Sequence, residues 1–158
     1  MILDFSNLKR VFIKDNQIGC FGSSKTSPLN KKLDLYTDGE ILYTQFKPNS
    51  NHMGWGGVVH GGIFSVILEE LLGLEAVFKT KQACVATSIT VNFQGPTSFD
   101  DVYTLIARLE SGRDNHQIDV IGEVYNSGNI LCLSACGQYH SLNIKPKKII
   151  VFEEGISR

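Results

Sequence analysis

The sequence predicts an α+β fold in which an antiparallel sheet covers one long central helix. Residues 61–78 contain no proline and carry apolar side chains at helical spacing, which predicts a helix about 25 to 30 Å long. Two strand-like runs precede this stretch, and four more with short turns between them follow it. At 158 residues the chain is long enough for one domain with a substantial core.

Before the helix we expect a short docking helix and one hairpin. Residues 1–19 carry apolar side chains at loosely helical spacing, and residues 23–32 are polar and contain a proline. Residues 33–36 and 40–47 are typical of strands, and Thr37-Asp38-Gly39 between them is typical of a hairpin turn.

After the helix the chain is predicted to be all strand. Four runs are rich in apolar and β-branched residues and are separated by turn-forming residues: 84–93, 102–110, 117–125 and 130–139. We expect the core of the domain at about 30–143. Residues 1–29 then form an N-terminal extension, and residues 144–158 form a tail that is either an extra strand or a flexible segment.

One arc of the predicted helix differs from the rest of its surface. At about 100° per residue the large apolar side chains cover most of the circumference, which predicts a buried helix. The remaining arc holds small residues with Glu69 in its middle: Gly62, Ser65, Gly73 and Ala76. We therefore expect Glu69 to be a buried carboxylate that points into a gap where a ligand or a backbone approaches closely. Glu70 and Glu75 lie on the flanking arcs, and we interpret them as solvated.

The start of this helix is predicted to bind a developing negative charge. Gly61 and Gly62 destabilise a helix by about 1 kcal/mol each relative to alanine, so they indicate that something contacts the backbone there. The first N–H groups of a helix have no intrahelical partner and carry the positive end of its dipole. With His60 as a helix cap and Glu69 two turns later, this stretch can polarise a carbonyl group and deliver water to it.

The composition excludes several classes of protein. A formal net charge of -1 argues against a nucleic-acid-binding protein, which needs a basic face. Neither a signal peptide nor a membrane span is predicted, so we expect a cytoplasmic protein that does not bind membranes. The four cysteines and the isolated histidines lack the spacing of a metal site, so we expect reduced thiols, no metal and no cofactor.

The stretch Gly54-Trp55-Gly56-Gly57-Val58-Val59-His60-Gly61-Gly62, followed by Glu69-Glu70, resembles the signature of hotdog-fold acyl-CoA thioesterases of the phenylacetate-type (PaaI-like) branch. The resemblance covers about residues 20–139. It implies a hotdog fold, a homodimer or homotetramer, and hydrolysis of an acyl-CoA substrate. It also implies that Glu69 takes the place of the catalytic acid of the family and Gly61 that of the oxyanion-hole amide. We expect the Gly62 amide to help bind the carbonyl, with His60 beside it.

The resemblance also implies residues that contact the substrate. Met53 stands where the family often has glutamine, which leaves Asn51 and His52 as the nearest polar residues. On the strand after the helix, Thr87 is next to the position where the family often has serine or threonine, and we expect the partner subunit to supply it. Arg113 is either a solvated loop residue or a contact to the phosphates of coenzyme A.

Two questions stay open from the sequence. Glu69 acts either as a general base toward water or as a nucleophile. The alternative to an enzyme is a catalytically silent acyl-CoA-binding or scaffold dimer, which the unusual residues Met53 and Ala86 leave possible. An enoyl-thioester hydratase does not match, because those enzymes need a histidine base in a different loop motif. The acyl group is not specified.

Overall fold

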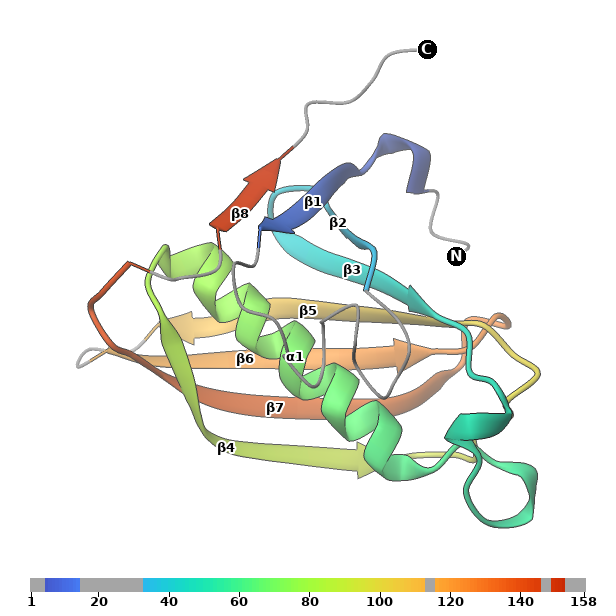
Figure 1. The fold of residues 1–158 in the computed structure, drawn as a ribbon. Helices are drawn as coiled ribbons and strands as arrows, with labels where there is room; N and C mark the ends of the chain where they lie inside the picture. Colours follow the sequence, from blue (N-terminus) through green and yellow to red (C-terminus); the bar gives the residue numbers. More distant parts are fainter. Residues whose placement is uncertain (1–4, 15–32, 113–115, 146–148, 153–158) are drawn as a thin grey trace.

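The structure is a computed structural model that describes residues 5–14, 33–112, 116–145 and 149–152 (Figure 1). In chain order its elements are three short 3-10 helices, one long helix and eight strands: η1 (Phe5–Asn7), β1 (Lys9–Lys14), β2 (Leu35–Thr37), β3 (Ile41–Phe46), η2 (Ser50–His52), η3 (Trp55–Gly57), α1 (Gly61–Thr80), β4 (Cys84–Phe93), β5 (Tyr103–Gly112), β6 (Gln117–Tyr125), β7 (Leu131–Ser141) and β8 (Ile149–Phe152).

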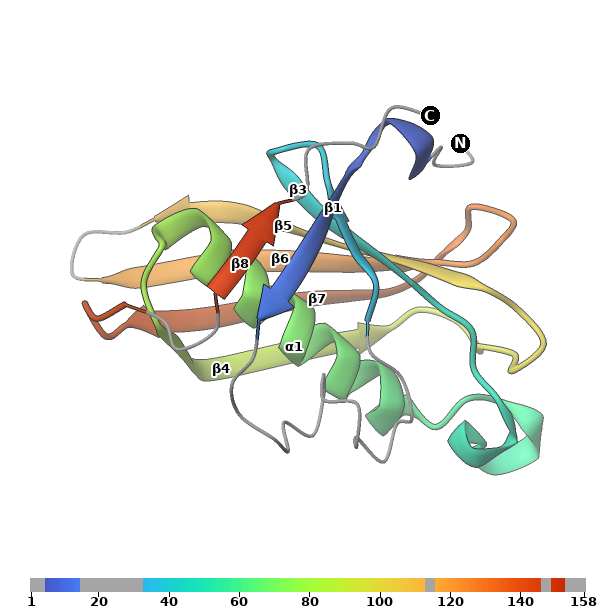
Figure 2. The same ribbon diagram turned by 45° about the horizontal axis from the view of Figure 1, so that its top comes forward.

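The strands form one antiparallel sheet in the order β4-β7-β6-β5-β3-β2-β1-β8. Helix α1 packs across one face of this sheet and contacts β3, β4, β5, β6 and β7 (Figures 1 and 2). The predicted α+β architecture with a central helix is therefore confirmed. In the part of the chain that the structure describes, β4 and β8 are the two edge strands.

The core lies between α1 and the sheet. Phe64, Leu68, Leu71 and Leu72 of the helix are fully buried, and they face buried side chains of the strands that include Leu105, Val120, Val124 and Leu133. The Phe64 ring meets Phe46 and Tyr103 edge to face, with centroid distances of 5.7 and 5.0 Å. Such aromatic pairs add to the stabilisation from apolar burial, because ring edges and faces carry opposite partial charges.

Several predicted boundaries are confirmed. The helix begins at Gly61, and the strands Cys84–Phe93 and Gln117–Tyr125 have the predicted bounds. The predicted hairpin is formed by β2 and β3, and its turn is held by Asp38, whose Oδ1 accepts hydrogen bonds of 2.9 Å from the N–H groups of Glu40 and Ile41.

The predicted docking helix at the N-terminus is wrong. Residues 9–14 form the strand β1, which pairs with β2 on one side and β8 on the other. Val11 lies opposite Leu35 in one pairing and opposite Phe152 in the other, so the strand is stabilised by residues that are distant in sequence. Of the two alternatives for the C-terminal tail, the extra strand is confirmed by β8.

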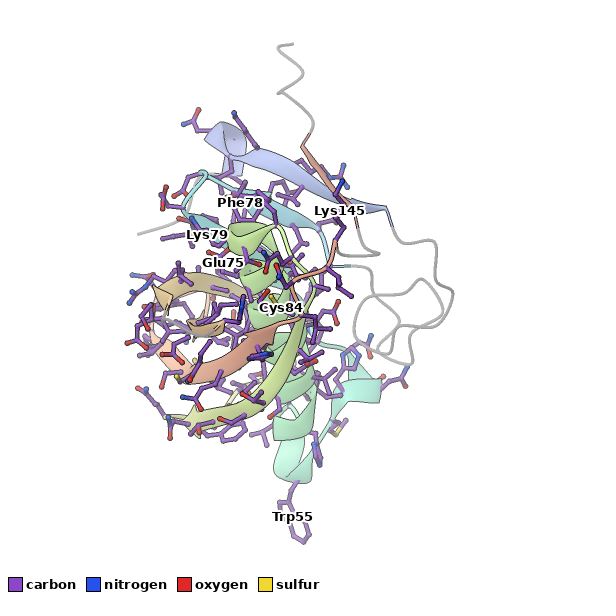
Figure 3. The ribbon with its side chains drawn as sticks, turned by 90° about the vertical axis from the view of Figure 1, so that its left-hand side faces the viewer. Trp55, Glu75, Phe78, Lys79, Cys84 and Lys145 are labelled. Carbon is purple, nitrogen blue, oxygen red and sulfur yellow. The ribbon has the colours of Figure 1, made fainter. Side chains whose placement is uncertain are left out.

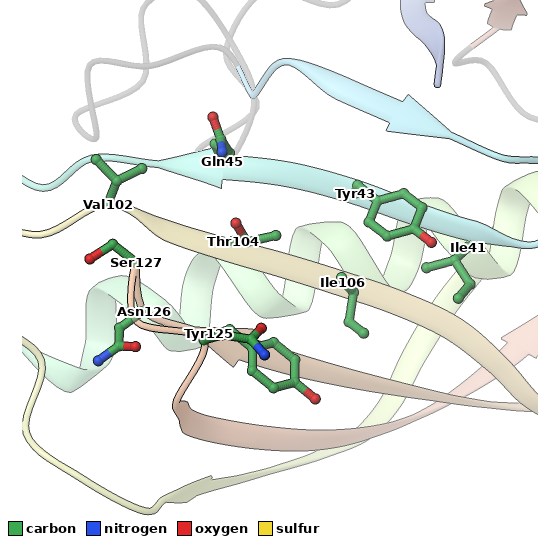
Figure 4. A pocket seen from close by; sticks show the side chains of 10 residues that line it. Ile41, Tyr43, Gln45, Val102, Thr104, Ile106, Tyr125, Asn126 and Ser127 are labelled. Atoms are coloured by element: carbon green, nitrogen blue, oxygen red, sulfur yellow. The ribbon is translucent and has the colours of Figure 1, made fainter. Parts of the chain in front are cut away.

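The face of the sheet that is turned away from α1 carries a groove of about 530 Å³ (Figure 4). Its lining includes Ile41, Tyr43, Thr104, Ile106 and Tyr125, and among the described residues it includes no carboxylate, histidine or cysteine. The groove therefore offers hydroxyl groups, such as those of Tyr43 and Thr104, without a carboxylate or histidine among its described lining residues to activate them. Within the described residues, no helix combines the length and the apolar character that crossing a membrane requires.

Candidate active site

The loop that leads into α1 is fixed by a reciprocal cap in η2. The Asn49 Oδ1 accepts a hydrogen bond of 2.9 Å from the Asn51 N–H, and the His52 Nδ1 accepts one of 3.1 Å from the Asn49 N–H. The His52 side chain is buried beside Phe46, with a ring-centroid distance of 5.2 Å. These contacts indicate that His52 has a structural role in holding the loop. The contacts of Asn51, His52 and Met53 with a substrate stay predictions.

The glycines of the loop place it directly against the start of α1. A Cβ at Gly54 would lie 2.9 Å from the His60 Cα, which is closer than two such atoms can approach. Gly56 and Gly57 have φ values of 66° and 81°, which side chains other than glycine rarely adopt. The loop tip presents Trp55, which is 94% exposed and projects away from the sheet (Figure 3).

At the start of α1 one backbone donor is occupied and another is not. His60 caps the helix, because its Nδ1 accepts a hydrogen bond of 3.0 Å from the Gly62 N–H. The predicted cap is therefore confirmed, and the cap occupies the Gly62 amide. Among the described residues the Gly61 N–H has no hydrogen-bond partner. A Cβ at Gly61 would lie 2.8 Å from the Phe93 ring, so this ring of β4 lies against the helix start.

Glu69 lies at a groove between α1 and the edge strand β4. The groove has a volume of about 410 Å³, and the charged residues of its described lining are Glu69, Glu70 and Lys145. The rest of this lining is mostly apolar: Gly73, Leu74, Val77, Ala83, Cys84, Val85, Ala86, Tyr139, Leu142 and Ile144. The groove joins a carboxylate to an apolar surface, which suits a substrate with an apolar part beside its reacting group.

The expectation that Glu69 is buried is wrong for the single chain, in which this residue is exposed. The small residues of its arc are also used differently from the prediction. Gly73 faces the ring of Tyr139, Ala76 is fully buried, and the Ser65 Oγ donates a hydrogen bond to the Gly61 carbonyl. The gap that the helix pattern indicated is therefore filled largely by the chain itself.

Gly61 and Glu69 are eight residues apart on the same helix. At 1.5 Å per residue their Cα atoms are separated by about 12 Å along the helix axis. A carbonyl oxygen that binds the Gly61 amide at about 3 Å leaves its carbon too far from Glu69 of the same chain for direct attack. One chain therefore carries both groups, but these two groups of the same chain cannot act on the same carbonyl.

The structure describes only one of the two further residues predicted to contact the substrate. Thr87 is exposed on β4, beside the irregular pairing between Ala86 and Ser88, and its Oγ1 donates a hydrogen bond of 3.1 Å to the Gln138 carbonyl. Arg113 lies outside the described residues, as does Cys20. Within the described residues, Cys84, Cys132 and Cys136 form no disulfide. Within the described ranges, no three histidine, cysteine, aspartate or glutamate residues gather around one point that could hold a metal.

The surroundings of Glu75 differ from those that the sequence predicts. It was expected to be solvated, but it is fully buried, and neither carboxylate oxygen has a hydrogen-bond partner among the described residues. Burial raises the pKa of Glu75 from 4.5 to about 7, against a smaller lowering by the charge of Lys79. The amphipathic pattern could not reveal this, because the groups near Glu75 come from other parts of the chain, namely Leu109 of β5 and Asp38 and Glu40 of the β2–β3 turn.

Comparisons with known proteins identify a related family and similar folds. Residues 56–132 match the family model of the thioesterase superfamily. The structure resembles the PaaI protein from the phenylacetic acid degradation operon of E. coli (TM-score 0.65, 16% identity, covering 72% of this chain and 81% of that chain). It also resembles smu.793 from Streptococcus mutans UA159, whose structure was solved bound to acetyl CoA (TM-score 0.70, 13% identity, 84% and 99% covered).

A third similar structure is longer than this chain. The match to the thioesterase superfamily protein RHA08564 has a TM-score of 0.64 and 22% identity, and it covers 70% of this chain but only 54% of that protein. A comparison with curated protein sequences found no match. The match to the thioesterase superfamily over residues 56–132 includes Gly56, Gly57, the helix start and Glu69. The chain has the hotdog fold of these proteins.

Proposed function

We propose that this chain hydrolyses acyl-CoA thioesters, with the Gly61 amide as the oxyanion donor and Glu69 as the catalytic carboxylate. The observation that carries the proposal is the pairing of two features on α1. The Gly61 N–H at the positive end of the helix is unoccupied among the described residues, and Glu69 is exposed at an apolar groove. A thioester needs both features, since its oxygen gains negative charge while its carbon is attacked.

The proposed reaction breaks the bond between the acyl carbon and the sulfur. Glu69 either removes a proton from water, whose oxygen then bonds to the acyl carbon, or attacks that carbon to form an anhydride, which water hydrolyses. On either route the Gly61 amide and the helix dipole stabilise the negative oxygen. The electron pair of the broken bond leaves on sulfur, and the thiolate of coenzyme A then takes up a proton. The products are the free acid and coenzyme A.

The proposed enzyme is a homodimer that pairs through β4. This strand has a hydrogen-bonded neighbour only on its β7 side within the described chain, and most of its residues are exposed. They include Val85, Ile89 and Phe93, which are 44%, 37% and 57% exposed. A long unpaired edge with exposed apolar side chains is a template for pairing with another strand.

Antiparallel pairing of two β4 strands also joins the two parts of the site. At one end of β4 the Phe93 ring lies against Gly61, and at the other end Val85 and Ala86 line the groove of Glu69. A two-fold axis between the strands brings the Gly61 end of one subunit beside the Glu69 end of the other. Each site then consists of the amide of one chain and the carboxylate of its partner, which resolves the separation of about 12 Å within one helix.

The first experiment measures release of free thiol from a panel of aryl and straight-chain acyl-CoAs. We expect turnover by the wild-type protein and a stable dimer in light scattering. If every acyl-CoA binds but none releases thiol, the protein is the silent acyl-CoA-binding dimer instead.

The second experiment tests the shared site by mixing two inactive variants. Gly61→Pro removes the amide hydrogen at the first helical position, where proline is well tolerated, and Gly61→Ala is the control that keeps it. His60 already has a φ of -60° and a ψ of 127°, which a following proline accepts. After Gly61→Pro and Glu69→Gln subunits are unfolded and refolded together, each mixed dimer has one intact site, so we expect about a quarter of wild-type activity. Activity that stays at the level of the separate variants contradicts the shared site.

A further inference from the structure

Tyr139 links the sheet to the turn of α1 that carries Glu69. The tyrosine lies on β7, its side chain is 2% exposed, and its hydroxyl donates a hydrogen bond of 3.0 Å to the backbone carbonyl of Glu69. In a regular helix this carbonyl also accepts from the Gly73 N–H, so it receives two hydrogen bonds. The second bond ties the helix at Glu69 to a strand 70 residues later in the sequence.

Two glycines leave room for the Tyr139 ring. A Cβ at Gly137, two residues earlier on the same strand, would lie 2.6 Å from one edge of the ring, which is far inside van der Waals contact. On the helix side, a Cβ at Gly73 would lie 3.4 Å from the opposite edge. The ring is therefore held between the strand backbone and the helix backbone, so its hydroxyl has little freedom to leave the Glu69 carbonyl.

The hydroxyl is a permanent donor. Burial raises the pKa of Tyr139 well above its ordinary value, and the nearby charges of Glu69 and Glu70 raise it further. The phenol therefore stays protonated at any pH at which the protein is folded and active. Tyr139 also lines the same groove as Glu69, so its hydrogen bond to the Glu69 carbonyl lies at the candidate site itself.

We propose that Tyr139 is a positioning residue that fixes the Glu69 carboxylate for catalysis. The proposal rests on the proposed thioesterase function, in which Glu69 acts on a carbonyl presented across the β4 edge. Glu69 is exposed in the single chain, so burial of its side chain does not fix it there. The helix and its buried side chains, such as Leu68 and Leu72, set the overall placement of its backbone, and the hydrogen bond from Tyr139 acts on the Glu69 carbonyl itself. A displacement of about 1 Å can lower a rate by 10²-fold, so a modest loosening has a measurable effect.

The test compares two buried tyrosines that make the same kind of hydrogen bond. Tyr139→Phe removes only the hydroxyl that binds the Glu69 carbonyl. Tyr103→Phe is the matched control, because Tyr103 is 1% exposed and its hydroxyl donates a hydrogen bond of 2.8 Å to the Ser98 carbonyl. We expect Tyr139→Phe to lower kcat about tenfold with little change in KM, and Tyr103→Phe to leave kcat within about twofold at a similar loss of thermal stability.

Two further variants separate positioning from a general effect on stability. In the Glu69→Gln background, Tyr139→Phe should not lower kcat further, because its effect passes through the carboxylate. Gly137→Ala keeps the hydroxyl but displaces the ring, and it should reproduce the loss of kcat.

Other outcomes overturn the proposal. These are an unchanged kcat in Tyr139→Phe, an equal loss in Tyr103→Phe, or losses that multiply in the Glu69→Gln background. An active wild type with an unaffected Tyr139→Phe variant refutes only this positioning role. A wild type that hydrolyses no acyl-CoA refutes the proposed function, and the positioning role with it.

Discussion

Two carboxylates of α1 lie six residues apart and have opposite surroundings. Glu69 is exposed at the groove beside β4, where a second molecule can reach it. Glu75 is fully buried near the end of the helix, close to Lys79 and remote from Trp55 at the helix start (Figure 3). An exposed carboxylate keeps its charge at little cost, whereas a buried one without hydrogen bonds destabilises the folded state when it is ionised. The comparison predicts that Glu69 serves activity and that Glu75 controls the pH dependence of stability.

The largest expected effect is on activity and comes from Glu69→Gln. The variant is nearly isosteric but can neither accept a proton from water nor attack, so kcat should fall about 10²- to 10⁴-fold, or roughly 3 to 5 kcal/mol of barrier. Stability should change by less than about 0.5 kcal/mol, because the side chain is exposed. Thiol release and urea unfolding measure the two effects. Glu70→Gln, one residue further on, is the control and should cost less than about tenfold in kcat. Wild-type activity in Glu69→Gln removes this residue from the mechanism.

The next effect is on stability and comes from Glu75. Its pKa is raised from 4.5 to about 7, so at intermediate pH the folded state keeps a proton that the unfolded chain has lost. The stability from this group is fully present below pH 4.5 and is lost as the pH rises through 7, by up to about 3 kcal/mol.

Glu75→Gln should remove this dependence and make the protein more stable than wild type at pH 8, with kcat within about tenfold of wild type. Urea unfolding of both proteins at pH 5 and pH 8 tests this, because all other titrating groups are shared. Equal slopes against pH in the two proteins contradict it.

The smallest effect concerns Lys79, which lies between the buried carboxylate and the β2–β3 turn. Its Nζ donates hydrogen bonds of 3.1 Å to the Gly39 carbonyl and to the Glu40 carboxylate, and its charge lowers the pKa of Glu75. Lys79→Met keeps the apolar stem and removes the charge, so it should destabilise the protein at pH 8 by about 1 kcal/mol. In the Glu75→Gln background the loss should be smaller, because the exposed Glu40 partner contributes little. An equal loss in both backgrounds shows that Lys79 does not act on Glu75.

The sequence alone determined the features that depend on neighbouring residues. The start of α1 and the bounds of β4 and β6 follow from local periodicity and turn residues, which lie within a few positions of the elements they delimit. The glycine motif and its spacing to Glu69 were also sufficient to indicate the family, which the match over residues 56–132 supports.

The tertiary structure alone decided the features that depend on distant residues. Residues 9–14 carry a pattern compatible with a helix, but they form a strand because β8 and β2 supply its hydrogen-bond partners. The surroundings of Glu69 and Glu75 could not be derived from the helix pattern, because they depend on other segments. Glu69 lies at a groove beside β4, and Glu75 lies near Leu109 of β5 and near the charges of the β2–β3 turn. The hydrogen bond from the Tyr139 hydroxyl to the Glu69 carbonyl joins residues 70 positions apart in the sequence. The physical reason is the same each time: burial and pairing are set by whichever segment folds against a residue, and its neighbours in sequence do not specify that segment.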